Sequence, residues 1–287
     1  MADPSTSSAP EVGRLQATFS EHPFENHGEQ WDALWKDSYS PWDRGGPSLA
    51  LNDLLLQHQE LFPRRGRRLK ALVPGCGRGH DVLLLSAFGY DVTGLDVSEA
   101  GLREAAENEK KSAGDEIFAV KEGVSEKGKV TWLAGDFFGA SGTLKPGEFD
   151  LIFDYTVSSL IYVGLSPLTS QFFCALPSVA RSKWAKRMSE LLSPDGRLVC
   201  LEWPLAKPFG LNDGPPWGLT AEAYESHLTH PGVDLEYNPS GLVASSVPTT
   251  TTPGALRQLA RIKPSRTHES GHDSSGNVID FISIWSH

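Results

Sequence analysis

The segment that most constrains the fold is a loop with a glycine at every second position, set between two short apolar runs. The runs are residues 69–73 and 91–95; the loop, residues 74–79, follows the first and leads into a helical pattern that starts at His80. Glycines let the backbone pass close to a ligand, and the helix behind them offers free N–H groups. Asp96 ends the second run, where a carboxylate can accept hydrogen bonds from both hydroxyls of a ribose. The pattern predicts a nucleoside held on an α/β sheet.

The spacing of the glycines indicates which nucleoside is held. A dinucleotide fingerprint, G-x-G-x-x-G, needs a third glycine at position 80, but that residue is His80 and the third glycine is Gly79. G-x-G-x-G with an acidic partner resembles the first motif of class I S-adenosylmethionine methyltransferases. We therefore expect Gly75, Gly77 and Asp96 to bind this donor. A glycine-rich turn that only connects a strand to a helix is the alternative.

Short apolar runs and helical patterns alternate along the rest of the chain. Strands are expected at residues 130–134, 149–154 and 197–201, and helices at 98–111 and 184–192. Alternation of this kind predicts an α/β domain with a mostly parallel sheet and helices on both of its faces. The other expected elements are helices at residues 30–38, 47–62 and 222–228, a helix or strand at 256–262, and a closing strand at 278–285.

Composition is that of an ordinary globular protein. The chain has 287 residues, 39% hydrophobic and 22% charged, and its apolar stretches fall far short of the roughly 20 residues that a bilayer requires. Residues 1–25 begin with a Ser/Pro/Ala-rich stretch without an apolar core, so a disordered tail is expected there and not a signal peptide. This leaves a single domain at residues 26–287 and a cytoplasmic location.

Charge and cysteine content exclude several kinds of partner. The net charge is −10 and the one basic cluster, at residues 64–70, is short, so no nucleic-acid partner is expected. Cys76, Cys174 and Cys200 are too few and too scattered for a disulfide framework, and none forms a pair with metal-ligand spacing. We expect a small-molecule partner, no metal and no membrane.

Two further strand ends carry candidate binding residues. Asp136 and Phe137 follow the run at 130–134, so we expect Asp136 to accept a hydrogen bond from an adenine amino group and Phe137 to pack on the ring. An Asp-initiated turn followed by core phenylalanines gives the same pattern. Tyr155 follows the run at 149–154, where its hydroxyl is expected near the sulfonium or the acceptor. A core tyrosine with its tip in water is the alternative.

Three tryptophans stand close together in the N-terminal part of the chain. Trp31 and Trp35 lie one helical turn apart, and Trp42 falls in a turn-rich loop at residues 40–46. A stripe of this kind is more often core than binding site, yet an aromatic face attracts a cationic sulfonium by about 0.5 to 2 kcal/mol when desolvated. We expect the helix and the loop to form a lid over the cofactor.

Taken together, these motifs resemble the thiopurine methyltransferase family, most closely its plant and fungal thiol and halide methyltransferase branch. The resemblance spans about residues 31–217, with a weaker echo at Arg266-Thr267-His268 and Trp285. It implies a Rossmann-like class I methyltransferase sheet of seven strands, with S-adenosylmethionine as donor and S-adenosylhomocysteine as product. The residues that carry it are Trp31, Trp35, Pro41-Trp42-Asp43, Leu72 to Gly77, His80-Asp81, Gly94-Leu95-Asp96, Asp136-Phe137-Phe138, Phe149-Asp150, Asp154-Tyr155, Trp184-Ala185, Pro194-Asp195-Gly196 and Gly214-Pro215-Pro216.

The resemblance also implies roles for individual residues. Arg181 is expected as a positive charge near the acceptor, where it would favour the thiolate form of a thiol. A thiolate or a halide is already nucleophilic, so catalysis is expected to rest on in-line positioning and desolvation. No catalytic residue is assigned beyond the candidates Tyr155 and Arg181. The implied donor contacts are Trp31, Trp35, Trp42, Gly75, Asp96, Asp136, Phe137 and Tyr155.

One segment departs from the family pattern. In the family the Asp-Tyr strand end runs almost directly into a segment like residues 172–177, whereas residues 157–171 intervene here. Codons for this stretch can contain a splice donor, a branch point and an acceptor, so we hypothesise an unspliced intron, with Thr156 truly joined to Phe172. The alternative is a genuine loop that reshapes the acceptor pocket or abolishes activity.

The sequence therefore predicts a monomeric methyltransferase that moves a methyl group from S-adenosylmethionine to a small thiol or to a soft anion such as iodide or bisulfide. Two alternatives stay open. One is O- or N-methylation of a small secondary metabolite, and the other is a cofactor-binding pseudo-enzyme whose acceptor site is blocked by residues 157–171.

Overall fold

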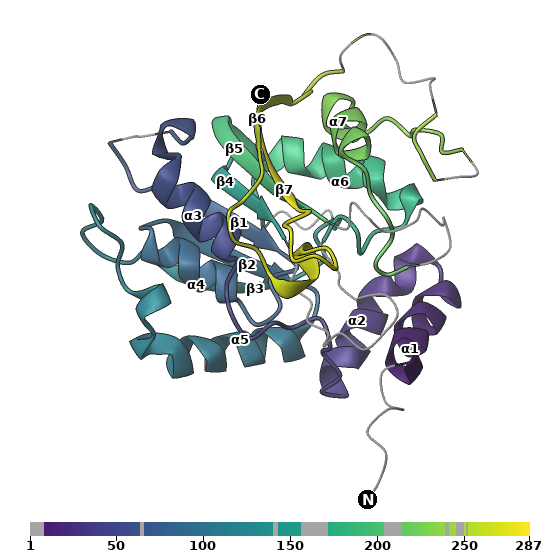
Figure 1. Cartoon of the computed structure of the whole chain (residues 1–287), viewed down its shortest axis with the longest axis horizontal. Coiled ribbons are helices and arrows are strands. Elements are labelled where there is room, and N and C mark those ends of the chain that lie inside the picture. Colours follow the sequence, from purple (N-terminus) through teal and green to yellow (C-terminus); the bar gives the residue numbers. More distant parts are fainter. Residues whose placement is uncertain are drawn as a thin grey trace, which may run out of the picture.

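Seven strands form one sheet in the computed structural model, which describes residues 9–63, 66–139, 143–155, 172–203, 214–238, 241–244, 250 and 252–287 (Figure 1). The sheet order is β3-β2-β1-β4-β5-β7-β6; β7 runs antiparallel to both neighbours, and the strands from β3 to β5 are parallel. The predicted seven-stranded, mostly parallel class I methyltransferase sheet is confirmed. The strands are β1 (Lys70–Pro74), β2 (Asp91–Asp96), β3 (Val130–Ala134), β4 (Phe149–Asp154), β5 (Leu192–Glu202), β6 (Arg257–Ile262) and β7 (Phe281–Ser286).

Helices cover both faces of the sheet, as predicted. In the described part of the chain the α-helices are α1 (Ala9–Ser20), α2 (His27–Lys36), α3 (Leu49–Gln57), α4 (His80–Ala87), α5 (Glu99–Lys111), α6 (Ser178–Leu191) and α7 (Ala221–Thr229). The short 3₁₀ helices are η1 (Phe24–Asn26), η2 (Gln59–Leu61), η3 (Ser112–Gly114), η4 (Glu116–Phe118) and η5 (Glu269–Gly271). Figure 1 shows α1 and α2 packed together at one end of the molecule.

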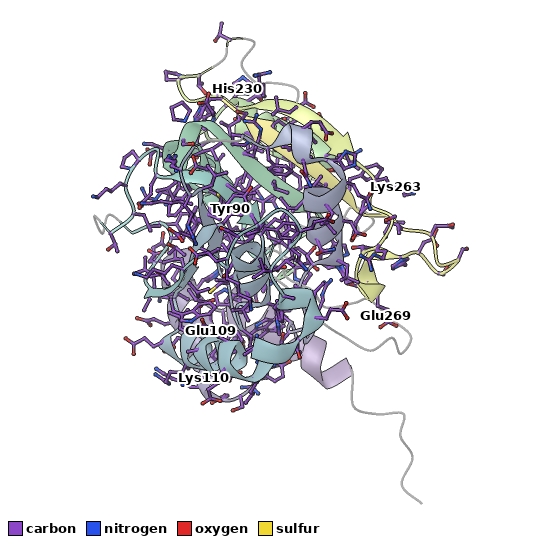
Figure 2. The ribbon with its side chains drawn as sticks, turned by 90° about the vertical axis from the view of Figure 1, so that its left-hand side faces the viewer. Tyr90, Glu109, Lys110, His230, Lys263 and Glu269 are labelled. Atoms are coloured by element: carbon purple, nitrogen blue, oxygen red, sulfur yellow. The ribbon has the colours of Figure 1, made fainter. Side chains whose placement is uncertain are left out.

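Local sequence explains why α5 forms and how it is oriented. The Ser98 hydroxyl accepts a hydrogen bond from the Gly101 N–H at 3.1 Å, which caps the start of the helix. Ala105 lies on the inner side of α5 and is buried, whereas Glu109 and Lys110 lie at the periphery of the molecule (Figure 2). This amphipathic pattern fixes which side of α5 meets the sheet.

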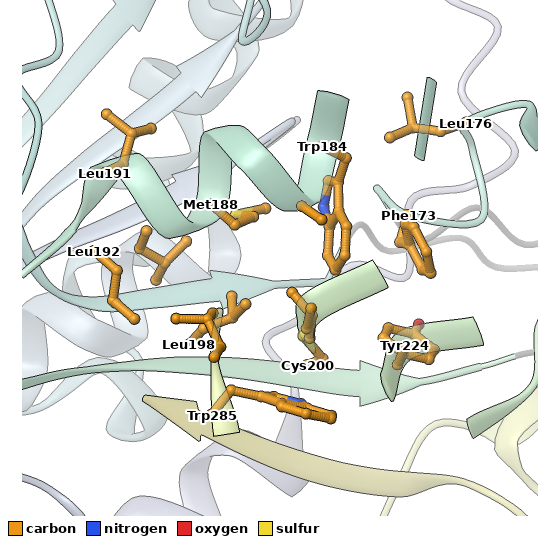
Figure 3. Packing of buried hydrophobic residues seen from close by; sticks show 14 of the residues in the cluster. Phe173, Leu176, Trp184, Met188, Leu191, Leu192, Leu198, Cys200, Tyr224 and Trp285 are labelled. Carbon is orange, nitrogen blue, oxygen red and sulfur yellow. The ribbon is translucent and has the colours of Figure 1, made fainter. Parts of the chain in front are cut away.

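The core is divided between the two faces of the sheet. Successive residues of a strand point to opposite faces, so in β4 Ile152 packs with α6 and α7 while Leu151 and Phe153 pack with α3 and α4. Trp184 and Met188 of α6 form the centre of the first layer (Figure 3). Strands that are buried on both faces are nearly continuous apolar runs, which is why they stand out in the sequence.

The chain changes direction across the sheet at β1. This strand pairs in parallel with β2 on one side and with β4 on the other. The chain leaves β1 toward α4 on one face and later reaches α6 on the opposite face. Ligands of open α/β sheets bind at such a switch point, outside the carboxyl ends of the strands. The glycine-rich loop follows β1 and Tyr155 follows β4, so both lie at this point.

The expected disordered tail is wrong from Ala9 onward, because α1 occupies residues 9–20. Leu15 and Phe19 of this helix are buried in a cluster with Trp35 of α2. The stability of a short helix comes mainly from packing and little from composition. The Ser/Pro/Ala-rich composition of the first residues therefore did not predict this helix, which forms by packing against the tryptophans.

Several boundaries differ from the expected ones. The helix expected at 47–62 ends at Gln57, because His58 has left the helical region (φ −126°, ψ 44°). α6 begins at Ser178, six residues before the expected start at 184, and β5 begins at Leu192 although Pro194-Asp195-Gly196 resembles a turn. The segment at 256–262, for which the sequence allows a helix or a strand, forms β6.

The inserted residues 157–171 lie outside the described residues. Among the helices that are described, none combines the length and hydropathy needed to cross a membrane.

Candidate active site

A cavity of about 660 Å³ opens beside the glycine-rich loop. Its volume lies within the range of about 300–1,000 Å³ typical of small-molecule sites. Walls come from α2 and from the segments that follow β1, β2 and β3, so the cavity lies at the carboxyl ends of the strands. The lining residues are Phe24, Glu25, His27, Gly28, Glu29, Trp31, Trp35, Trp42, Gly75, Gly77, Leu95, Asp96, Val97, Gly135, Asp136, Phe137, Phe138, Phe172, Ala175, Leu176 and Lys183.

Asp96 anchors the glycine-rich loop at the floor of this cavity. Its Oδ2 accepts the Gly77 N–H and its Oδ1 accepts the Ser98 N–H, both at 2.9 Å. Burial raises the pKa of Asp96, against the lowering effect of these backbone donors. Gly77 has φ +51°, and a Cβ there would lie 3.3 Å from the Trp35 ring, so a side chain at this position meets both strain and crowding.

The three predicted tryptophans meet at one wall of the cavity. Trp42 packs edge-on against Trp31 and Trp35, with ring centroids 5.1 and 5.5 Å apart. Phe19 of α1 lies behind Trp31 at 4.5 Å. The wall thus combines the two roles that the sequence left open, because its rings belong to a buried cluster and also line the cavity.

An ion-pair network holds the loop that carries Trp42. Asp43 forms an ion pair with Arg78, and its Oδ1 lies 3.2 Å from His80 Nε2. Burial opposes ionisation of Asp43, but the His80 hydrogen bond and the Arg78 charge outweigh it and lower the pKa of Asp43 to about 2. Sequence reasoning assigned no function to Arg78. Its position inside the glycine-rich loop was the available signal.

The opposite end of the cavity is lined by phenylalanines. Phe137 packs against Phe138 and Phe172 at 5.3 and 5.0 Å. Asp136 Oδ1 accepts the Phe138 N–H at 2.9 Å, which is the Asp-initiated turn that the sequence allows. Both Asp136 and Phe137 nevertheless line the cavity, so the turn presents them to a ligand. Lys183 also lines this cavity.

Two predicted residues do not line the main cavity. Tyr155 borders a small neighbouring cavity, of about 20 Å³, which shares Trp35, Trp42 and Gly77 with the large one. Arg181 is buried in α6, with its guanidinium 5.6 Å from the Phe173 ring and 5.2 Å from the Tyr237 ring. The structure therefore brings together all the predicted donor contacts except Tyr155, and it places Arg181 away from them.

Tyr155 instead joins a polar cluster that the sequence did not predict. Its hydroxyl accepts a hydrogen bond from Arg44 and lies 2.5 Å from His268 Nδ1. Thr267 Oγ1 donates to Asp280 Oδ2 at 2.6 Å on the far side of His268. The weak family echo at Arg266-Thr267-His268 was the only sequence signal for these contacts.

Comparison with known proteins decides the family. The model of the family described as "Thiopurine S-methyltransferase (TPMT)" matches residues 26–242. The chain belongs to the thiopurine S-methyltransferase family. It is an S-adenosylmethionine-dependent methyltransferase, and its sheet has the strand order and the one antiparallel strand of the class I methyltransferase fold.

Relatives of known description cover most of the chain. Thiocyanate methyltransferase 1 of Brassica oleracea is 36% identical over 214 residues, 73% of this chain and 76% of that protein. Its Arabidopsis thaliana namesake is 35% identical over 231 residues, 79% of this chain and 83% of that protein. A probable thiol methyltransferase 2 of Arabidopsis thaliana is 31% identical over 247 residues, 86% of this chain and 89% of that protein.

Solved structures share the fold at low identity. A 1,6-didemethyltoxoflavin-N1-methyltransferase of Burkholderia thailandensis matches with a TM-score of 0.52 and 14% identity, over 99% of this chain and 92% of that one. At this level of identity, the similarity shows only that the two proteins share a fold. Among the described residues, no group of three or more His, Cys, Asp or Glu side chains is placed to hold a metal ion.

Proposed function

We propose that this protein transfers the methyl group of S-adenosylmethionine to a small thiol or to a soft anion such as thiocyanate, iodide or bisulfide. The observation that carries the proposal is the cavity in which a tryptophan wall faces the glycine-rich loop and Asp96. The thiol and thiocyanate methyltransferases among the relatives support this choice of acceptor. We assign the activity to one domain at residues 26–287, acting as a monomer in the cytoplasm.

The residues of the cavity fit the parts of the donor. The Asp96 carboxylate would accept the ribose hydroxyls, with lone pairs left after its two backbone contacts. Asp136 and Phe137 would hold the adenine, and the tryptophan wall would face the sulfonium through its π-electrons. The donor supplies an activated methyl group on a positively charged sulfur, so the protein's task is to position the two reactants and exclude water.

A soft nucleophile suits this site because little further chemistry is needed. Buried aromatic side chains lower the local polarity, which strips water from a small anion and strengthens its attraction to the sulfonium. Oxygen acceptors such as phenols need a general base in addition to this positioning and desolvation.

A turnover screen tests the proposal. The protein is incubated with S-adenosylmethionine and, in turn, thiocyanate, iodide, bisulfide, small thiols, phenols and amines, and S-adenosylhomocysteine formation is measured. We expect turnover with the thiols and soft anions. Turnover confined to phenols or amines would contradict the assigned acceptor class, and absence of calorimetric S-adenosylhomocysteine binding would contradict the assigned donor site.

Residues 157–171 call for a parallel measurement. A chain in which Thr156 is joined directly to Phe172 is compared with the full chain in the same screen, and a transcript is sequenced across the segment. If the segment is an unspliced intron, the shortened chain is the active form and the transcript lacks these codons. If the full chain is a pseudo-enzyme, we expect it to bind the donor as tightly as the shortened chain does but to show no turnover.

A further inference from the structure

Four polar side chains form a row that joins the N-terminal loop to the C-terminal segment. Arg44 Nη1 donates to Tyr155 Oη, which lies 2.5 Å from His268 Nδ1, and His268 Nε2 lies 3.6 Å from Asp280 Oδ2. Tyr155 and Asp280 are buried, with 2% and 1% of their surface exposed. Groups from three distant parts of the sequence thus meet at the end of β4.

Hydrogen-bonding capacity orders the protons in this row. A guanidinium can only donate, so the Tyr155 oxygen accepts from Arg44, and when His268 carries its proton on Nε2 the phenolic proton is donated to His268 Nδ1. A neutral imidazole carries one N–H, which in this arrangement is on Nε2, 3.6 Å from the Asp280 carboxylate and without a hydrogen bond to it. A hydroxyl, an imidazole and a carboxylate in this order can move a proton away from a nucleophile.

The row borders the donor site. Tyr155 leaves β4 at the switch point of the sheet, and the small cavity that it lines shares Trp35, Trp42 and Gly77 with the large cavity. Tyr155 therefore lies next to the residues that the two cavities share.

We propose that Tyr155, with His268 and Asp280 behind it, takes the proton from acceptors that reach the site as thiols. The proposal rests on the proposed function and deepens it. Hydrogen sulfide and alkyl thiols are partly or wholly protonated on sulfur at neutral pH, whereas iodide and thiocyanate carry no proton. The row is required for the first group of acceptors and not for the second.

The proton transfer is balanced as follows. The acceptor's S–H bond breaks as its proton binds Tyr155 Oη, while the phenolic proton passes to His268 Nδ1. The bonding pair remains on the sulfur, and the imidazolium that forms faces Asp280. This sulfur pair then forms the bond to the methyl carbon as the old carbon–sulfur bond breaks toward the leaving thioether. The imidazolium finally gives its proton to solvent.

Charged groups face the row from each neighbouring element. They are Arg44 from the loop after α2, Asp81 from α4, His272 after η5 and Asp280 before β7. Burial raises the pKa of Asp81 and of Asp280 to about 6, so above neutral pH both are mainly ionised. The two carboxylates then offset the charge of Arg44 and of an imidazolium at position 268.

The test compares protonated and proton-free acceptors in the full chain. In His268→Asn we expect kcat with β-mercaptoethanol to fall about 100-fold at pH 7, and kcat with iodide and thiocyanate to stay within about threefold of the unchanged protein. The thiol rate of the variant should recover toward about pH 9, where the thiol ionises in solution. Tyr155→Phe deletes only the hydroxyl oxygen, which interrupts the relay. We expect the same difference between thiols and the proton-free acceptors.

Two controls separate a relay from a structural role. S-adenosylhomocysteine affinity, measured by calorimetry, should be unchanged in both variants. His230→Asn is the matched control, because His230 is also buried and hydrogen-bonded yet lies far from Glu269, the neighbour of His268 (Figure 2). It should leave both acceptor classes unaffected.

The outcomes are distinct. Loss confined to thiols, with donor binding retained, supports the relay. Parallel loss with thiols and iodide, or full thiol activity in both variants, overturns it. If the unchanged protein methylates iodide and no thiol, the relay is overturned while the methyl transfer of the proposed function stands. If it methylates no acceptor of either class, the proposed function fails as well.

Discussion

Asp96 holds together two segments that line the large cavity. Its two oxygens accept the N–H groups of Gly77 and Ser98, which fixes the glycine-rich loop and the start of α5 relative to each other. Each carboxylate oxygen still has lone pairs for a ligand. Burial raises the pKa of this group, so its negative charge is costly in the folded chain.

Asp96→Asn should weaken donor-site binding without unfolding the protein. An amide has one acceptor oxygen and cannot replace both backbone contacts, so we expect the Kd for S-adenosylhomocysteine to rise about 10- to 100-fold, the equivalent of roughly 1.5–3 kcal/mol. Calorimetry measures the change. Asp115→Asn, on an exposed residue, is the control and should bind as the unchanged protein does. An unaltered Kd in Asp96→Asn would remove Asp96 from the donor site.

Asp154 should make the stability of the protein depend on pH. Burial raises its pKa to about 7, against contacts with the Trp184 indole and the Phe173 N–H. The folded chain therefore binds a proton that the unfolded chain has lost between about pH 4 and pH 7, and the free energy of unfolding falls as pH rises through this window. Asp154→Asn lacks this loss. Between pH 5 and pH 8 the free energy of unfolding of the variant should therefore rise by about 2–3 kcal/mol relative to that of the unchanged protein.

Urea unfolding of the Asp154 variant at the two pH values measures this difference. The exposed Asp115→Asn control should follow the unchanged protein at both. Parallel stability profiles for Asp154→Asn and the unchanged protein would show that Asp154 is already ionised at pH 5 and that its burial does not shift the pKa.

Among the elements, the turn from β1 into α4 leaves little room for an added side chain. Gly79 precedes α4 with φ +71°, and a Cβ there would lie 2.2 Å from the Trp132 ring of β3. The same Trp132 ring also fills the space beside Gly94 of β2, because a Cβ at Gly94 would lie 2.8 Å from the ring. The third glycine of the motif is therefore required by packing between elements as well as by its backbone conformation.

Gly79→Ala and Gly147→Ala form a matched pair that separates these two causes. Both glycines have positive φ, +71° and +66°, but nothing lies within 4 Å of a Cβ at Gly147. Backbone strain should destabilise each variant by about 1–2 kcal/mol, and the clash with Trp132 should add at least about 1 kcal/mol in Gly79→Ala. Denaturant unfolding measures both, and equal losses would show that Trp132 moves aside freely.

Sequence patterns predicted the elements whose cause is local or periodic. The strands β1 to β4 are short apolar runs, and the glycine-rich loop has a recognisable spacing of glycines, so both were predicted to within a residue or two. Helix α1 was missed because its stability comes from Phe19 packing on Trp31, a contact that no local pattern encodes. Likewise Arg44, His268 and Asp280 meet only through the tertiary fold, and Arg181 fits the family motif yet lies outside the cavity.

At the scale of the whole molecule, the donor cavity and the polar row depend on different parts of the chain. The cavity is built from residues between Phe24 and Lys183, whereas the row needs His268 and Asp280 near the other end. The two sites meet because β7 runs antiparallel to β5, so that its start at Phe281 lies beside the end of β5 at Glu202. A change in the C-terminal segment can therefore alter acceptor chemistry while leaving the donor site intact.

Hydrogen exchange should map this division onto the molecule. Backbone amides of β1 and β4, in the centre of the sheet, should exchange slowest, because they open only when the whole domain unfolds. Addition of S-adenosylhomocysteine should slow exchange in α2 and in the loop after β1, and should leave β6 unchanged. Protection that appears in β6 and not in α2 would place the ligand elsewhere.

The position of β7 also has a consequence for how the protein is made. Residues 257–262 leave the ribosome before residues 281–286, yet β6 has no strand to pair with until β7 is available. Until then the outer edge of β5 stays open, and His268 and Asp280 have not reached Tyr155. A nascent chain can thus assemble the large cavity first, and it gains the polar row only after residues 281–286 have left the ribosome.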